Sequence, residues 1–186
     1  MSLSQNKDAV VLIGMPGVGK STIGVLLAKC LSKPFLDTDV WIQSEEKSRL
    51  QEILDTVGQR AFCALEERYL CAIPPDPLVV ATGGSAVYSD KAMKHLKTFG
   101  ILVHLFLPFD ELRSRLSNWT MRGIVIGKDK TLEDLFEERL PLYERYADVT
   151  VICSGLNHEE VLSKTLNTLK EYGYGSGGTS GNTCCG

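Results

Sequence analysis

The sequence predicts an α/β fold in which a five-stranded parallel sheet is flanked by helices. Short apolar runs rich in Val, Ile and Leu alternate along the chain with stretches of helical periodicity. The near-continuous apolar character of these runs is typical of parallel strands that are buried on both faces. At 186 residues and 44% hydrophobic content, the chain is long enough to build one full core, and no internal repeat divides it.

The predicted elements follow one another from residue 9 to residue 172. Strands are expected at Ala9–Ile13, Phe35–Asp37, Leu78–Thr82, Ile101–Leu107 and Val149–Cys153. Helices are expected at 19–32, 58–72, 89–98, 108–117, 131–146 and 157–172. Residues 1–172 are therefore predicted to form a single domain. Residues 173–186, which are rich in Gly and Ser, are predicted to be a flexible tail.

Composition argues against several classes of partner and location. The formal net charge is only −3, with 20 basic and 23 acidic side chains mixed along the chain, so we expect neither nucleic acid nor a membrane surface as a partner. No apolar segment has the length of a signal peptide or a membrane span, which predicts a cytoplasmic protein. The six cysteines form no C-x-x-C pair, which argues against a zinc site, and we expect no ordered role for Cys184 and Cys185 in the tail.

The most informative motif is GMPGVGKST, directly after the first predicted strand. It fits the pattern G-x-x-x-x-G-K-[ST] of a phosphate-binding loop between a strand and a helix. A glycine-rich turn that binds nothing would need neither the lysine nor the following hydroxyl. We therefore predict a P-loop NTPase fold that binds a nucleoside triphosphate through Gly14, Met15, Pro16, Gly17, Val18, Gly19, Lys20, Ser21 and Thr22.

Polar residues follow the predicted strands where ligands of such sheets bind, at the carboxyl ends. The second strand ends in Asp37-Thr38-Asp39, and the third leads into Gly83-Gly84-Ser85. Asp37 and Asp39 are two residues apart, so in an extended segment both would point toward the phosphate loop. One could hold a Mg²⁺-bound water and the other a substrate hydroxyl. The alternative that one of the two caps a helix stays open.

Taken together, these motifs resemble those of shikimate kinase. The resemblance rests on GMPGVGKST, on LDTD at residues 36–39, on ATGG at 81–84, on the segment around Arg122 and on RLPLYERYAD at 139–148, spaced as in that family. It implies a nucleoside-monophosphate-kinase-like fold with a lid at about 118–130. It also implies ATP-dependent, Mg²⁺-dependent phosphorylation of a small molecule, shikimate, to shikimate 3-phosphate, by an enzyme that needs no partner and is expected to be a monomer.

The resemblance also implies roles on the nucleotide side. Lys20 would steady the transferred phosphoryl group, Ser21 would bind Mg²⁺ directly, and Asp37 would support the ion through water. Arg122 would close over the site and neutralise phosphoryl charge. Arg115 would stack on the adenine ring.

On the acceptor side, the resemblance implies that Asp39 hydrogen-bonds the acceptor hydroxyl and orients it or takes its proton. Gly83 and Gly84 would place bare backbone against the substrate ring. Arg139 would bind the substrate carboxylate as a two-pronged fork.

Two departures from the family pattern fall on the acceptor side. Cys63 stands where the family has an arginine, and Ser85 stands where it has a third glycine. Arg60 lies one helical turn before Cys63 and is a candidate to replace the missing arginine as a substrate-binding residue, whereas Glu66 would lack its usual partner. Three interpretations stay open: a shikimate kinase with a modified pocket, a kinase of another polyol or cyclic hydroxy acid, and a catalytically idle paralogue with a regulatory role.

Overall fold

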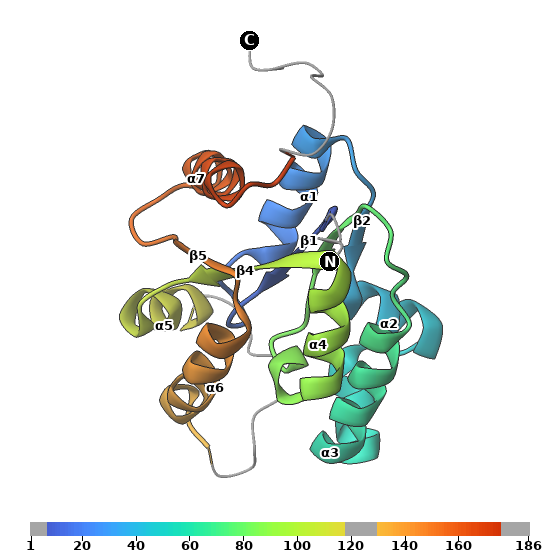
Figure 1. Cartoon of the computed structure of the whole chain (residues 1–186). Helices are drawn as coiled ribbons and strands as arrows, with labels where there is room; N and C mark the ends of the chain where they lie inside the picture. The colour runs from blue at the N-terminus through green and yellow to red at the C-terminus, as the bar shows by residue number, and fades with distance from the viewer. Residues whose placement is uncertain (1–6, 118–129, 176–186) are drawn as a thin grey trace.

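A five-stranded parallel sheet forms the centre of the protein (Figure 1). The computed structural model describes residues 7–117 and 130–175. The strands are β1 (Ala9–Ile13), β2 (Phe35–Asp37), β3 (Val79–Ala81), β4 (Gly100–Phe106) and β5 (Val149–Ile152), in the spatial order β2-β3-β1-β4-β5. The predicted α/β fold and its five parallel strands are confirmed.

Strand β1 lies at the centre of this sheet, and all five of its residues are buried. It pairs with β3, where Leu12 lies opposite Ala81, and with β4, where Ile13 lies opposite His104. The chain builds β2 and β3 on one side of β1 and then crosses to build β4 and β5 on the other. The loop that follows β1 therefore lies at the point where the strand order reverses, which is where open parallel sheets bind ligands.

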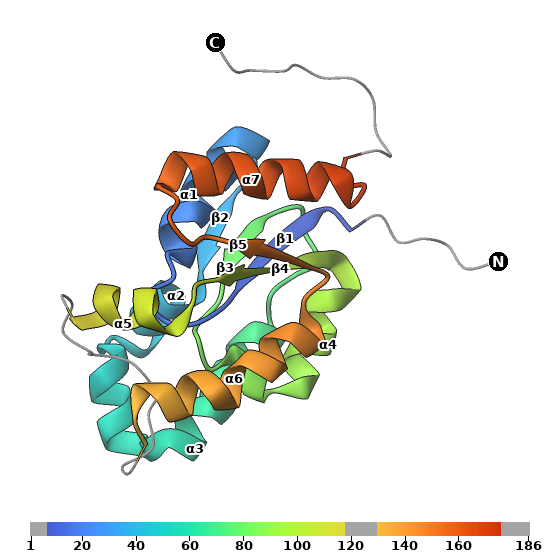
Figure 2. The same cartoon turned by 90° about the vertical axis from the view of Figure 1, so that its left-hand side faces the viewer.

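Helices cover both faces of the sheet. In Figure 2, α1 and α7 lie on one face, and α3, α4 and α6 lie on the other. The helices are α1 (Lys20–Leu31), α2 (Thr38–Glu46), α3 (Leu50–Cys71), α4 (Asp90–Phe99), α5 (Phe109–Ser117), α6 (Leu132–Tyr146) and α7 (His158–Glu171), with a 3₁₀ turn η1 (Ala86–Tyr88) before α4.

The sequence prediction missed α2 and the first half of α3. The predicted helix start at Gly58 is instead a kink inside α3, where this residue has a φ of 77°. Before the kink, Leu50, Ile53, Leu54 and Val57 have the i, i+3, i+4, i+7 spacing of an amphipathic helix, so a signal for this part of α3 was present.

The ordered chain also continues beyond the predicted boundary at residue 172. Tyr174 packs against the core, and its hydroxyl donates a hydrogen bond of 3.0 Å to the backbone oxygen of Asp8. The ammonium group of Lys33 lies 4.9 Å from the centre of the Tyr174 ring. The packed part of the described chain therefore reaches Tyr174, two residues beyond the predicted boundary.

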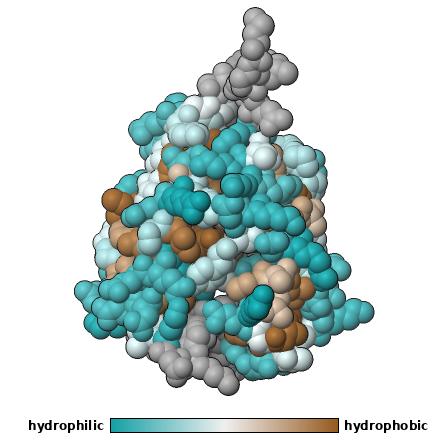
Figure 3. All heavy atoms as spheres, turned by 60° about the horizontal axis from the view of Figure 1, so that its bottom comes forward, coloured by the Kyte–Doolittle hydropathy of each residue, from teal (hydrophilic) through white to brown (hydrophobic). Residues whose placement is uncertain are grey.

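The surface carries few large apolar side chains among the described residues. Those that are exposed are Val25, Val40, Val57, Ile152 and Tyr172, each from a different part of the fold. On the face shown in Figure 3, hydrophilic residues cover most of the surface and apolar residues form separate patches. Among the helices described, none combines the length and apolar character that crossing a membrane requires.

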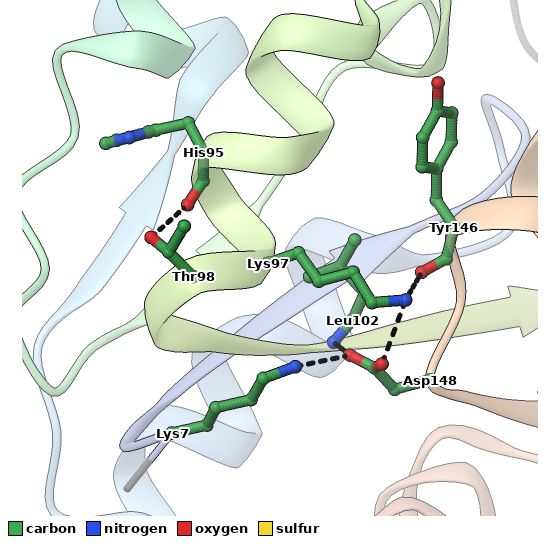
Figure 4. A network of polar contacts seen from close by, with 7 residues as sticks. All are labelled: Lys7, His95, Lys97, Thr98, Leu102, Tyr146 and Asp148. Atoms are coloured by element: carbon green, nitrogen blue, oxygen red, sulfur yellow. Dashed lines mark hydrogen bonds and ion pairs between the residues drawn. The ribbon is translucent and has the colours of Figure 1, made fainter. Parts of the chain in front are cut away.

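A carboxylate stabilises the opposite end of the sheet, where β4 and β5 begin. Asp148 accepts a hydrogen bond of 3.0 Å from the backbone N–H of Leu102 (Figure 4). Its oxygens also pair with Lys7 at 3.3 Å and with Lys97 at 3.1 Å. Lys97 donates a further hydrogen bond to the backbone oxygen of Tyr146. Because the Asp148 side chain is only 7% exposed, its charge depends on these partners.

We predict that Asp148→Ala lowers the free energy of unfolding by about 2–3 kcal/mol, because it leaves a backbone N–H and two ammonium groups without their carboxylate. The two lysines are partly solvated, which keeps the loss moderate. Urea denaturation of the two proteins measures the difference. Asp110→Ala is the matched control, since its pair with Arg113 is exposed on both sides, and we expect a loss below about 0.5 kcal/mol.

Candidate active site

A cavity of about 1180 Å³ opens at the carboxyl ends of the strands. Its walls come from the loop after β1 with the start of α1, from the segment that joins α2 to α3, from the turn after β3, and from α5, α6 and the residues before α7. The cavity is therefore built by segments that are far apart in the sequence and that meet because all five strands run in the same direction.

The loop after β1 has the geometry of a phosphate cradle. Gly14 has a φ of 143°, and a Cβ there would lie 2.5 Å from the backbone oxygen of Leu105. The ammonium group of Lys20 donates to the backbone oxygens of Gly14 at 2.8 Å and of Met15 at 2.9 Å. The predicted residues Gly14, Met15 and Val18 do not line the cavity. Gly14 and Met15 hold Lys20, and the Val18 side chain is buried.

The remaining residues of this loop face the cavity, which is lined by Pro16, Gly17, Gly19, Lys20, Ser21 and Thr22. Gly19 is the N-cap of α1 and offers no side-chain oxygen to the N–H groups of the first helical turn. These donors and the positive end of α1 are therefore available for an anion, as phosphate binding requires.

Acidic groups around Lys20 oppose the effect of burial on its pKa. Burial lowers the pKa of Lys20 to about 8, whereas Asp39, Asp37 and Glu66 counteract this shift. Beneath the loop, burial and then the charge of Lys20 lower the pKa of His104 to about 4, so this imidazole is neutral at pH 7.

The structure corrects the expectation that Asp37 and Asp39 lie in one extended segment. Strand β2 ends at Asp37, whose carboxylate caps α2 by accepting from the N–H groups of Asp39 at 3.0 Å and Val40 at 3.2 Å. Asp39 lies in the first turn of α2 and lines the cavity. Both carboxylates still act on Lys20 because the cap places them at the same helix end. Burial raises the pKa of Asp39 to about 6, against the opposing effect of Lys20.

The glycine turn after β3 forms the floor of the cavity beside Asp39. The N–H of Gly83 donates a hydrogen bond of 3.0 Å to the hydroxyl of Thr38, which connects this turn to the start of α2. A Cβ at Gly83 would lie 2.3 Å from Oε1 of Glu66 and 2.7 Å from Oδ1 of Asp39. A Cβ at Gly84 would lie 3.0 Å from Nη1 of Arg139. Only hydrogen fits at these two positions without displacing charged groups.

Arg139 reaches the same floor from α6 and is 1% exposed. Its Nε donates a hydrogen bond of 3.0 Å to the hydroxyl of Tyr88. The hydroxyl of Tyr143, one helical turn further along α6, donates a hydrogen bond of 2.7 Å to the backbone oxygen of Gly84. The structure thus brings Arg139, Gly83, Gly84, Asp39 and Lys20 together, as the sequence predicted.

Ser85, one of the two departures from the family pattern, is the partner of Glu66. Its hydroxyl donates a hydrogen bond of 2.6 Å to Oε2 of this buried carboxyl group. The other oxygen, Oε1, has no hydrogen-bond partner among the described residues. Burial raises the pKa of Glu66 to about 7, although the hydrogen bond from Ser85 opposes the shift. Glu66 thus has Ser85 as a hydrogen-bond donor to one of its two oxygens, in a chain where Cys63 stands at the position of the family's arginine.

Arg60 does not line the large cavity. It is exposed on α3 and lies with Cys63, Tyr88 and Glu138 around a separate hollow of about 340 Å³. The prediction that Arg60 and Cys63 share a helix face agrees with this arrangement, but that face borders the smaller hollow. In this structure Arg60 therefore does not take the place of an arginine in the large cavity.

Arg115 of α5 lines the far end of the cavity, next to Leu116 and to residues 156–158 before and at the start of α7. Arg122 and the predicted lid at about 118–130 lie outside the described residues, apart from Lys130. Sequence reasoning missed the wall that α2 and α3 provide, which consists of Gln43, Arg49, Leu50, Gln51, Glu52 and Phe62.

We predict that Glu66→Gln changes the pH dependence of stability. Glu66 titrates at about 7 when folded and near 4.5 when unfolded, so its stabilising proton is fully present below pH 4.5 and is lost as the pH rises through 7. Glutamine keeps an uncharged group at this position at every pH. The melting temperature of the variant, relative to the original protein, should therefore increase between pH 5 and pH 8 in thermal denaturation.

Glu67→Gln is the matched control, because Glu67 accepts a hydrogen bond of the same 2.6 Å length from Ser89 at the partly exposed surface. Its relative melting temperature should stay constant over this pH range. A constant difference for Glu66→Gln as well would contradict the role assigned to burial.

Comparisons with known proteins identify the family of this chain. The family model described as shikimate kinase matches residues 16–170. A shikimate kinase from Thermodesulfovibrio yellowstonii is 36% identical over 166 residues, which is 88% of this chain and 94% of that protein. The structure is similar to that of the shikimate kinase from Acinetobacter baumannii in complex with shikimate, with a TM-score of 0.81, 27% identity and coverage of 91% and 96% of the two chains. The shikimate kinase from Aquifex aeolicus matches with a TM-score of 0.74, 31% identity and coverage of 87% and 96%. The chain therefore belongs to the shikimate kinase family and is an ATP-dependent small-molecule kinase.

Proposed function

We propose that the protein transfers the γ-phosphoryl group of ATP to a hydroxyl of shikimate, forming shikimate 3-phosphate. One observation carries this proposal: a single cavity joins the phosphate loop to a floor made by Asp39, Gly83, Gly84 and Arg139. A phosphoryl donor and a small acid with hydroxyl groups can therefore lie next to each other inside it. The overall similarity of the structure to a relative in complex with shikimate supports the choice of acceptor.

On the donor side, the loop N–H groups and Lys20 would bind the β- and γ-phosphates, and Arg115 would contact the adenine ring. The Ser21 hydroxyl lines the cavity and is a suitable oxygen ligand for Mg²⁺, with Asp37 available through water. Since no three His, Cys, Asp or Glu residues gather as a metal site in the described part, the ion would be held mainly by the triphosphate itself. When bound, Mg²⁺ would neutralise phosphate charge. We assign Arg122 to the same task.

On the acceptor side, Asp39 would accept the hydrogen bond of the attacking hydroxyl and orient it for in-line transfer. Arg139 would bind the carboxylate of the acceptor with its planar fork. The ring would lie on the bare backbone of Gly83 and Gly84. Positioning and electrostatics supply most of the acceleration in phosphoryl transfer, so a preformed arrangement of these charges is sufficient.

We further propose that the enzyme acts as a monomer in the cytoplasm. A single copy of the chain supplies both the phosphate loop and the floor made by Asp39, Gly83, Gly84 and Arg139, which supports a site formed within one protomer. The described cysteines Cys30, Cys63, Cys71 and Cys153 are free, which is compatible with a reducing compartment. Analytical sedimentation at micromolar protein concentration would test whether the protein is a monomer.

The decisive experiment measures ADP release with ATP and Mg²⁺ in the presence of shikimate, and in parallel with gluconate and other polyols and cyclic hydroxy acids. Phosphorus NMR of the product identifies the phosphorylated hydroxyl. Turnover with shikimate supports the proposal. Turnover with another acceptor only would overturn the choice of acceptor, and no turnover with any acceptor would leave the idle nucleotide-binding paralogue in its place.

We predict that Asp39→Asn lowers kcat at least about 100-fold while the affinity for ATP changes less than about twofold. Asparagine keeps the size of the side chain but removes the charge that orients the hydroxyl. Because Asp37 and not Asp39 caps α2, urea stability should be retained. Glu45→Gln, on the exposed surface of the same helix, is the control and should keep full activity. A kcat within twofold of the original would contradict the role of Asp39.

We predict that Gly83→Ala lowers kcat/KM for the acceptor about 10- to 100-fold with little change in KM for ATP. The backbone of Gly83 does not have a positive φ, so alanine fits the backbone conformation and only its Cβ causes a clash. Its Cβ would push the ends of Glu66 and Asp39 away from their present positions. Steady-state kinetics with each substrate varied in turn checks this. Equal losses for ATP and acceptor would argue against a floor specific to the acceptor.

A further inference from the structure

Tyr88 makes two contacts with Arg139. It ends η1, three residues after Ser85, and is half-buried. Its hydroxyl oxygen accepts the hydrogen bond from Nε of Arg139 at 3.0 Å, and the guanidinium carbon lies 5.0 Å from the centre of its ring. One side chain therefore contacts the arginine both through a hydrogen bond and through a cation–π interaction.

These contacts lie on the far side of Arg139 from the cavity. Arg139 lines the large cavity, whereas Tyr88 lines only the smaller hollow on α3 and α6. A Cβ built at Gly84 would lie 3.0 Å from Nη1 of Arg139, so this outer nitrogen lies at the glycine floor of the large cavity. Because a guanidinium group is planar, a hydrogen bond at Nε fixes the direction in which its outer N–H groups point.

Tyr88 is itself held in place from α6. The carboxylate of Glu138 lines the same hollow and interacts with the Tyr88 hydroxyl group, and it also pairs with Lys130. Burial raises the pKa of Tyr88, so the phenol stays protonated while its oxygen accepts the hydrogen bond from Arg139. A chain of polar contacts therefore runs from Lys130 through Glu138 and Tyr88 to Arg139.

We propose that Tyr88 is a positioning residue, which sets acceptor affinity by aiming the guanidinium group of Arg139 at the acceptor carboxylate. This inference rests on the proposed function, in which Arg139 binds that carboxylate. Tyr88 touches neither substrate and acts through Arg139. With Cys63 in place of an arginine, the acceptor side depends strongly on how Arg139 is oriented, and Tyr88 contributes to that orientation through the hydrogen bond at Nε.

The test is Tyr88→Phe, which keeps the ring and removes only the hydroxyl. We expect KM for shikimate to rise about 5- to 30-fold, while kcat changes less than about threefold and KM for ATP less than about twofold. Tyr69→Phe is the matched control: its hydroxyl also bonds a carboxylate, that of Glu46 at 2.7 Å, but it lies outside both hollows. This control should keep all three constants.

A double-mutant cycle shows whether Tyr88 acts through Arg139. In an Arg139→Lys background, which lacks Nε, Tyr88→Phe should raise KM for shikimate by less than a further twofold. An unchanged KM in the single Tyr88→Phe variant, or a full additional loss in the Arg139→Lys background, would overturn the proposal.

A second readout does not depend on the acceptor. The Nε–H signal of Arg139 in ¹⁵N NMR, assigned by its loss in Arg139→Lys, should shift or exchange faster with solvent in Tyr88→Phe and stay unchanged in Tyr69→Phe. If the original protein fails to phosphorylate shikimate, the proposed function is overturned, and this signal still decides whether Tyr88 orients Arg139. A signal identical in Tyr88→Phe and the original protein would overturn the positioning role.

Discussion

The site depends on how a buried ammonium group is held. Lys20 lies inside the protein at the end of β1, and its charge is tolerated there because the backbone oxygens of Gly14 and Met15 accept its protons. This arrangement requires the loop to curl back over β1, which the positive φ of Gly14 permits. The same curl directs the N–H groups at the start of α1 into the cavity. One interaction therefore determines both the position of the lysine and the shape of the phosphate cradle.

The rest of the cavity balances this charge. Asp39 and Glu66 are both buried near Lys20, and burial raises the pKa of each carboxyl group. One oxygen of each lies close to the position that a Cβ of Gly83 would occupy, at 2.3 Å for Glu66 and 2.7 Å for Asp39. Arg139 adds a second cation from α6. Such a group of charges is stable only because the sheet and its helices hold each member at a fixed position, which is the preorganisation that phosphoryl transfer needs.

Of the two departures from the family pattern, Ser85 contacts a residue of another element. Its hydroxyl hydrogen-bonds Glu66 of α3, whereas Cys63, three residues earlier on that helix, borders the smaller hollow. The serine therefore provides a donor to an acidic group that the sequence left without one. Tyr88, three residues after Ser85, supports the guanidinium group of Arg139 from the other side. The 3₁₀ turn η1 and the turn before it thus supply contacts to two buried charged groups, Glu66 and Arg139.

The sequence by itself determined the five strands, the phosphate loop and the residues that follow β2 and β3. These signals are local: apolar runs, glycines at fixed spacing, and polar residues at strand ends. Asp37 and Asp39 were found in this way, but their geometry was not, because the N-cap that turns the chain after Asp37 competes with an extended conformation that the same residues also allow.

Only the tertiary structure decided that Ser85 pairs with Glu66, that Arg60 faces the smaller hollow and that Tyr88 supports Arg139. Each of these contacts joins residues on different helices and turns, and their relative positions follow from how α3, η1 and α6 pack on the sheet. Side-chain spacing along one helix predicts which residues share a face, but not which neighbour that face meets.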